Sequence, residues 1–172
     1  MEHEAVIVDP VIVRAFGGYA TGLSPVDRGK SGTKHTPLVS RTGVLLANRT
    51  TKASARDQRR IIPLVLMFPE VGGKPGRPRE LPDGAYADRG FDSEATREFL
   101  RWLGIEPHIA KRRAPHGSGL GKIRWVVERT ISWLKGLRRM RVRYDRLGVI
   151  IDAWTTLAAS AICFRILHHD CI

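Results

Sequence analysis

The segment 122–138 constrains the fold of this chain most, because its apolar spacing is typical of an amphipathic helix. At about 100° per residue, Arg124, Glu128 and Lys135 fall within roughly 40° of one another on a helical wheel. The apolar residues of the opposite face are Ile123, Val126, Trp133, Leu134 and Leu137. We therefore expect a helix that packs by its apolar stripe and presents one carboxylate between two cations.

Two upstream acids favour a functional role for this charged face over a merely solvated one. Asp9 follows the β-branched run Ala5–Val8, and Asp88 follows the strand-like Gly84–Ala87. Two carboxylates at strand ends and Glu128 on a helix are the components of a divalent-metal phosphoryl-transfer site.

Each acid also has a purely structural explanation. Asp88 can cap the turn that follows it, Glu128 can be a solvated helix residue, and Asp9-Pro10 can open a turn. Asp92 is a nearby competitor of Asp88, but its place before Ser93 suits a role at a helix start.

The charge balance predicts a polyanionic partner. The formal net charge is +12, and the excess gathers at 111–113 and 138–146, so phosphate backbones would be attracted. The same excess can also serve only solubility. With 172 residues and 42% hydrophobic content, the chain can form one domain with a core. Its two cysteines match no zinc or disulfide pattern, and Cys163 is expected to be buried.

No targeting signal or membrane span is expected. The first four residues are acidic rather than signal-like. The apolar segment 149–167 contains Asp152 and Arg165 together with hydroxyl side chains, which favours a buried core helix over a membrane span. We therefore expect a cytoplasmic protein without a membrane partner.

The local patterns predict an α/β fold, with a mixed sheet flanked by helices. Beyond the segments above, we expect a hairpin at 36–41 and 44–50, helices at 54–67 and 93–103, and a strand at 105–110. Ser93 and Gly104 would cap the second of these helices. The segment 15–34 is expected to be an exposed loop and 70–84 an irregular connection. His35 and His116 are expected to lie in basic loops, where phosphate contact or solvation is favoured over metal binding.

Four blocks in this order resemble bacterial insertion-sequence transposases of the DDE class, in particular the insertion-sequence-five family: VDRGKSGTKH, GRPRELPDGAYADRGFDS, GIEPHIAKRR and GLGKIRWVVERTISWLKGLRRMRVRYDR. The resemblance runs from about Val6 to Ile166 and implies a single ribonuclease-H-like domain over residues 1–172. In that family the first Asp ends the first strand, the second follows the fourth strand, and the Glu lies on a later helix. By motif match these catalytic, metal-binding residues are Asp9, Asp88 and Glu128.

The wider group also carries a Tyr-x2-Arg-x3-Glu-x6-Lys signature. Arg124, Glu128 and Lys135 match three of its positions, and Gly121 replaces the Tyr. The residues expected to contact DNA are Arg124, Lys135, Arg138 and Arg139. Alternatively, Arg124 only pairs with Glu128 one helical turn away.

The resemblance implies DNA strand cleavage and strand transfer at the ends of a mobile element. The expected cofactors are two Mg2+ or Mn2+ ions, and the expected partner is DNA, bound at the bacterial nucleoid by a homo-oligomer. Two alternatives remain: a non-catalytic basic nucleic-acid-binding protein, and a ribonuclease-H-like nuclease with another substrate.

Some residues depart from the family pattern. Pro10 follows Asp9 where relatives carry Ser or Thr, Ser40 stands where they often carry Asp, and Pro37 should make its strand an edge or disturb it locally. Full-length relatives also have a further N-terminal region that helps to bind terminal repeats. We therefore expect either the second reading frame of a split element, with a companion product, or a decayed copy with low activity.

Overall fold

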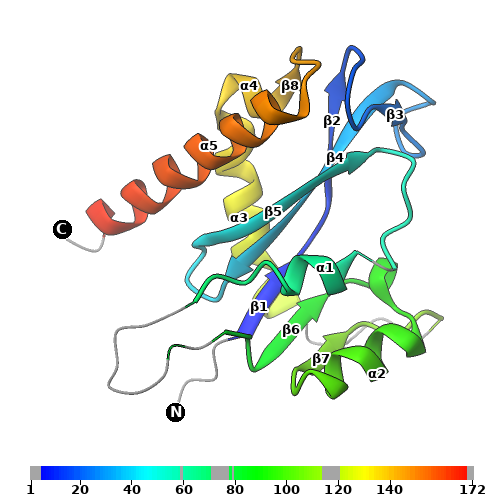
Figure 1. Cartoon of the computed structure of the whole chain (residues 1–172), viewed down its shortest axis with the longest axis vertical. Helices are drawn as coiled ribbons and strands as arrows, with labels where there is room; N and C mark the ends of the chain where they lie inside the picture. Colours follow the sequence, from blue (N-terminus) through cyan, green and yellow to red (C-terminus); the bar gives the residue numbers. More distant parts are fainter. Residues whose placement is uncertain (1–4, 59, 71–77, 79, 114–120, 170–172) are drawn as a thin grey trace.

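The computed structural model describes residues 5–58, 60–70, 78, 80–113 and 121–169. Within them lies an eight-stranded mixed sheet with helices on both faces (Figure 1). The strands are β1 (Ala5–Val8), β2 (Val11–Ala15), β3 (Gly22–Leu23), β4 (Ser31–Ser40), β5 (Leu45–Lys52), β6 (Gly84–Ala87), β7 (Glu106–Ile109) and β8 (Val142–Arg143). The helices are α1 (Ile61–Val65), the 3-10 turn η1 (Arg89–Phe91), α2 (Glu94–Trp102), α3 (Gly121–Gly136), α4 (Arg138–Arg141) and α5 (Gly148–His169).

The strands β1 and β2 form one interrupted strand along β4. Val8 pairs with Leu38, and Val11 resumes the same antiparallel register at His35. We call the interruption at Asp9-Pro10 the Asp9 break. It faces the part of β4 that contains Pro37, and a proline has no N–H to donate to a sheet ladder. The expected local disturbance at Pro37 is thus present, whereas the edge alternative is wrong, because β4 pairs on both sides.

The Asp9 break is also where the neighbours of this strand change. The β1 strand pairs in parallel with β6, which in turn pairs in parallel with β7. Beyond the break, β2 pairs in parallel with β8 instead. The sheet therefore divides beside Asp9, and the carboxyl end of β6 opens there (Figure 1).

Alternation along the strands separates two cores. Val6 and Val8 pack with α1, α2 and Phe91 on one face, whereas Ile7 packs with α3 and α5 on the other. Tyr86 of β6 also packs on the α3 side. Because side chains two residues apart share a face, the positions of Asp9 and Asp88 continue the rows of Ile7 and Tyr86.

Several predicted elements are present: the first strand, the hairpin, β6, α2, β7, α3 and the final helix. Gly104 ends α2 with φ +78°, as expected, but the side chain of Ser93 makes no capping hydrogen bond. The family matched below bears out the expected mixed α/β, ribonuclease-H-like fold. Most of 70–84 lies outside the described residues.

Two predictions fail because tertiary contacts override local pattern. The segment 15–34 is not one exposed loop, since it contains β3 and the start of β4. The helix expected at 54–67 shrinks to α1. Lys34 of β4, which is buried, donates to the carbonyl oxygen of Ala55 at 2.8 Å and to Asp57 Oδ1 at 2.7 Å, and these contacts hold the preceding turn against the sheet.

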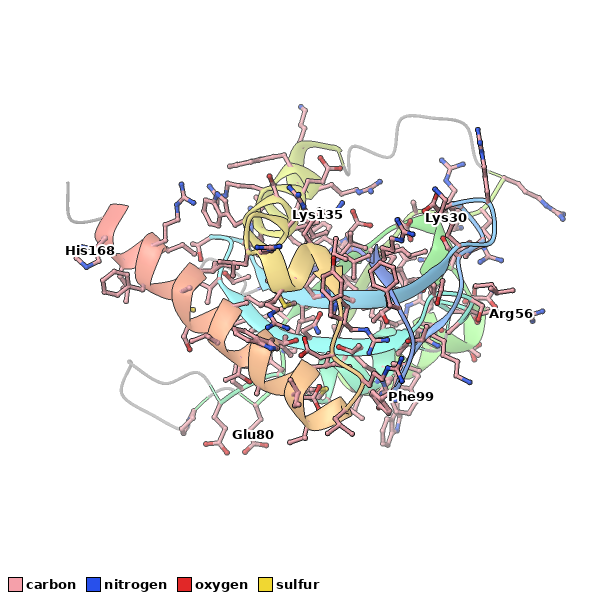
Figure 2. All side chains as sticks on the ribbon, turned by 90° about the horizontal axis from the view of Figure 1, so that it is seen from above. Lys30, Arg56, Glu80, Phe99, Lys135 and His168 are labelled. Atoms are coloured by element: carbon pink, nitrogen blue, oxygen red, sulfur yellow. The ribbon has the colours of Figure 1, made fainter. Side chains whose placement is uncertain are left out.

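The final helix α5 is not the buried core helix that its sequence predicts. It packs inward through Ile151, Ala158 and Ile162, but Phe164 is 65% exposed and Cys163 is only half-buried. It is the one described helix long and apolar enough to cross a membrane, and 17% of its most apolar window is buried. Figure 2 shows it running along the outside of the molecule towards His168.

The predicted environment of His35 is also wrong, because His35 is a buried residue of β4 and not part of a basic loop. Asn48 Nδ2 and Thr50 Oγ1 lie 3.4 and 3.2 Å from its Nδ1. Burial, assisted by the charge of Arg143, lowers the pKa of His35 to about 4. The imidazole is therefore neutral at neutral pH. His116 lies outside the described residues.

We expect His35→Asn to weaken the acid sensitivity of folding. The unfolded chain binds a proton at His35 near pH 6.5, whereas the folded chain does so only near pH 4. The free energy of unfolding therefore falls as the pH drops through this range, by about 3 kcal/mol from this group. Urea unfolding followed by circular dichroism at several pH values measures it. Parallel profiles for the variant and the parent chain would contradict the assignment.

Candidate active site

Asp9 and Asp88 lie side by side where two neighbouring strands end. The parallel register pairs Val8 with Ala87, so these acids are the next residues of strands about 4.8 Å apart. The side chain of Asp9 is 13% exposed, and Asp88 is half-buried. The expectation that the first acid ends its strand is met at the Asp9 break.

Arg124 of α3 connects Asp9 with Glu128. Its Nη2 donates to Asp9 Oδ2 at 3.0 Å and lies 3.9 Å from Glu128 Oε1, so these two carboxylate oxygens lie no more than about 7 Å apart. The i, i+4 pair of Arg124 and Glu128 that the sequence allowed is therefore present, but the shorter contact joins α3 to the sheet.

The charges of this group act on one another. Burial raises the pKa of Asp9, and the negative charges of Asp88 and Glu128 raise it further. The hydrogen bond and charge of Arg124 oppose these effects without cancelling them. Burial acts to lower the pKa of Arg124, but its hydrogen bond to Asp9 and the charges of the acids raise it overall. Asp9 and Glu128 thus pair with one guanidinium, and the negative charge of Asp88 also acts on it.

The donor set suits a hard divalent cation in its chemistry, because Mg2+ and Mn2+ prefer carboxylate oxygens. Among the described residues, however, no three His, Cys, Asp or Glu side chains are already close enough to hold an ion. The site is an acidic cluster closed by Arg124, and side-chain rotation is needed before Asp9, Asp88 and Glu128 could surround a cation.

Asp88 also caps a turn, as its structural explanation predicted. Its Oδ1 accepts a hydrogen bond from the backbone N–H of Gly90 at 2.8 Å, at the start of η1. A Cβ at Gly90 would lie 2.8 Å from that oxygen, so a larger residue there would displace the carboxylate from its capping position. The cap fixes the carboxylate beside Asp9, and the two roles are compatible.

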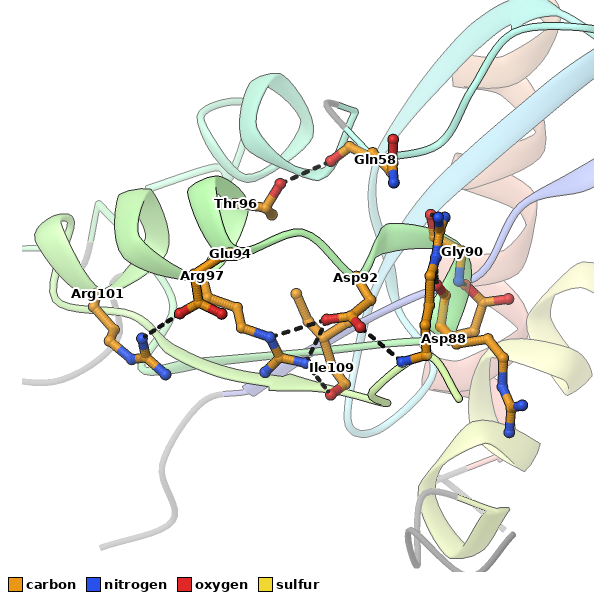
Figure 3. A network of polar contacts seen from close by, with 11 residues as sticks. Gln58, Asp88, Gly90, Asp92, Glu94, Thr96, Arg97, Arg101 and Ile109 are labelled. Atoms are coloured by element: carbon orange, nitrogen blue, oxygen red, sulfur yellow. Dashed lines mark hydrogen bonds and ion pairs between the residues drawn. The ribbon is translucent and has the colours of Figure 1, made fainter. Parts of the chain in front are cut away.

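Asp92 has a structural role, as predicted from its place before α2, but its partners were not predicted from the sequence (Figure 3). Its Oδ1 accepts hydrogen bonds from Arg97 Nε at 3.0 Å and Nη2 at 2.8 Å, and Arg97 also donates to the carbonyl oxygen of Ile109 at 2.7 Å. Burial acts to raise the pKa of Asp92, but the backbone N–H of Arg112 and the Arg97 guanidinium together lower it.

Arg112, which follows β7, also stabilises the turn η1 that begins after Asp88. Its backbone N–H donates to Asp92 Oδ2 at 2.7 Å, and its side chain donates to the carbonyl oxygens of Arg89 and Gly90 at 2.9 and 3.1 Å. The segment after β7 therefore clamps the turn that carries Asp88. The sequence signal was the cationic cluster 111–113, which pointed only to a polyanion.

The remaining residues predicted to contact DNA lie further along α3 and α4. Lys135 is exposed two turns after Glu128 (Figure 2). Arg138 is exposed at the start of α4. Arg139 is engaged within the molecule: its Nη1 lies 3.3 Å from Asp145 Oδ1, and its guanidinium lies over the ring of Trp154.

Comparison with known proteins identifies the class. A family model described as the transposase DDE domain matches residues 1–163, so the chain belongs to this family. The chain is also similar to a proposed transposase for insertion sequence element IS402 from Burkholderia cepacia, with 46% identity over 155 residues. That match covers 90% of this chain and 74% of the Burkholderia protein.

We expect Asp92→Asn to destabilise the fold by about 3 kcal/mol, because it leaves the buried guanidinium of Arg97 without its charge partner. Glu94→Gln is the matched control. Glu94 pairs with Arg101 at 3.7 Å with both side chains largely exposed, so its loss should cost less than about 1 kcal/mol. Urea unfolding measures both, and equal losses would refute the role of Asp92.

We expect Arg124→Gln to raise the pKa of Asp9 further, because the substitution removes the hydrogen bond and the positive charge that oppose burial. A carbon-13 NMR titration of the Asp9 carboxyl group measures this directly. Lys135→Gln, on the same helix but further from Asp9, is the control and should leave the midpoint in place. An unmoved midpoint in Arg124→Gln would show that the ion pair is not formed in solution.

Proposed function

We propose that this chain catalyses metal-dependent cleavage and strand transfer of DNA at the ends of an insertion-sequence-five element. The observation that supports this most is the gathering of Asp9, Asp88 and Glu128 around Arg124 in a member of the transposase DDE domain family. The described residues would form a single ribonuclease-H-like catalytic domain, because both cores share one sheet.

The chemistry of phosphodiester cleavage fits this group of residues. A phosphodiester resists attack because it is anionic and its leaving alkoxide is poor. Two bound Mg2+ or Mn2+ ions would supply Lewis acids for the attacking and the leaving oxygen. Asp9, Asp88 and Glu128 would hold them, and the capping hydrogen bond from Gly90 would keep Asp88 oriented. Water as the nucleophile gives hydrolysis, and a DNA 3′-hydroxyl gives strand transfer.

The cations of α3 and α4 would bind the DNA. Arg124 lies beside the acids and would contact a phosphate near the cut once it leaves Asp9. Lys135 and Arg138 extend the exposed positive surface away from it. Arg139 would have to release Asp145 to join them. The net charge of +12 supports binding that weakens steeply with salt. A homo-oligomer would bring two DNA ends together.

A non-catalytic basic nucleic-acid-binding protein is the second candidate. It is favoured by the cluster as it stands, in which Arg124 already pairs with two of the acids and Asp88 caps a turn. In that case the acids would serve only the fold, and DNA binding would be indifferent to divalent metal.

We expect Asp88→Asn and Glu128→Gln each to lower Mg2+-dependent nicking of DNA that carries the element's ends by more than about 100-fold, because even residues behind metal ligands contribute 10- to 100-fold. Binding of the same DNA should persist, since the cations remain. Glu94→Gln, an exposed glutamate on another helix, is the control and should retain activity. Unchanged cleavage in both site variants would reject the site and favour the second candidate.

A further inference from the structure

The outward face of α5 carries a coiled-coil repeat that the described part of the chain leaves uncovered. Its six positions have the 3-4-3-4-3 spacing of core positions in a heptad. We call them the α5 seam: Ile150, Ala153, Leu157, Ser160, Phe164 and Leu167. The four large side chains are 38% (Ile150), 58% (Leu157), 65% (Phe164) and 66% (Leu167) exposed.

The α5 seam is not needed to attach the helix to the domain. The inward face uses Ile151, Ala158 and Ile162, each no more than 3% exposed. On a helical wheel these residues lie on average about 150° from the centre of the seam. The helix therefore has two apolar faces, and Figure 2 shows that its outer side faces away from the sheet.

The α5 seam is electrically neutral in a strongly basic chain. Asp152 and Arg165 are the only Asp, Glu, Lys or Arg residues of α5, and neither occupies a seam position, although 27% of the whole chain is charged. A DNA backbone selects cations, so this face does not suit DNA. Two copies that each carry +12 repel each other, and a face without charge is where they can approach.

We propose that the α5 seam binds the α5 seam of a second copy of this chain, with the two helices antiparallel and related by a two-fold axis. One register aligns all six positions. It places Ile150 against Leu167 of the second copy, Ala153 against Phe164 of the second copy, and Leu157 against Ser160 of the second copy. A large side chain then meets a small one in two of the three kinds of layer.

A surface hollow independently supports this register. It has a volume of about 390 Å3 and lies at one end of the seam, lined by Val149, Ile150, Ala153, Trp154 and Leu157. Every lining residue is apolar. The small side chain of Ala153 lies in it, where the proposed register puts Phe164 of the second copy. A fully apolar hollow selects an aromatic or aliphatic occupant.

The hydroxyl group of Ser160 and the exposed area of the α5 seam are also compatible with a stable dimer. The hydroxyl of Ser160 already donates to the carbonyl oxygen of Thr156 at 3.1 Å, so covering it leaves no donor without a partner. The exposed fractions of the seam and of Val149 correspond to roughly 600 Å2 per copy. Complete burial of this area on both copies gives about 1,200 Å2, the lower bound for stable specific interfaces.

Light scattering coupled to gel filtration tests the proposal without DNA or metal, and therefore independently of catalysis. The full chain should have twice its monomer mass of 19.2 kDa. Leu157→Lys should weaken the dimer at least tenfold, because it places two like charges in the seam. Val26→Lys is the control: Val26 is 79% exposed outside α5, and its replacement should leave the dimer intact. Circular dichroism should show both variants folded.

A size swap tests the register. Phe164→Ala should weaken the dimer by leaving the hollow unfilled, and Ala153→Phe should weaken it by opposing two phenyl rings. The double variant Ala153→Phe with Phe164→Ala should restore it, because only this register joins the two positions.

A monomeric parent chain, or a dimer that survives Leu157→Lys, would overturn the proposal. So would failure of the double variant to regain affinity. A parent chain that stays monomeric but binds neutral phosphatidylcholine vesicles would instead assign the seam to a lipid surface.

Discussion

The candidate site depends on one constraint, the loss of sheet hydrogen bonding at the Asp9 break. Pro10 and the facing Pro37 have no N–H groups, so the ladder between the first strand and β4 is interrupted there. The interruption separates the neighbours of the strand, with β6 on one side of the break and β8 on the other. Asp9 therefore stands beside the open end of β6, where the chain places Asp88.

Arg124 reduces the electrostatic cost of placing these carboxylates close together. Burial and two neighbouring carboxylates oppose the charge of Asp9, and an uncompensated buried charge is costly. The guanidinium compensates part of that cost while joining α3 to the sheet. Its own position is set by α3, which packs on the sheet through Val126, Val127 and Ile131. The packing of one apolar stripe thus decides where both Arg124 and Glu128 meet the strand ends.

The sequence predicted the elements that depend on local patterns and the acids that belong to the family motif. Strands and helices with clear periodicity, such as β6 and α3, were predicted correctly. The motif pointed to three acids that lie near one another at the strand ends and on α3, and their catalytic role stays a prediction. The wrong predictions concern residues whose contacts join segments that are far apart in the sequence. Lys34 shortens α1 through partners more than twenty residues away, and His35 is buried by pairing within β4 and β5. The Arg97 and Arg112 contacts depend on packing that no local pattern records.

The helix of the seam, α5, and the helix of Glu128, α3, contact each other through cationic side chains on aromatic rings. The guanidinium groups of Arg129 and of Arg165 of α5 lie over the ring of Trp133 of α3, at 4.8 and 5.2 Å from its centre. Arg139 adds a second connection, because it lies over Trp154 of α5. Replacement of Arg165 therefore removes a contact with α3, the helix that carries Glu128. The six seam residues make none of these cation–π contacts, so a substitution such as Leu157→Lys separates association of two copies from the geometry of the acids. If two copies pair through α5, each copy holds its own complete set of acids, and the dimer presents two sites.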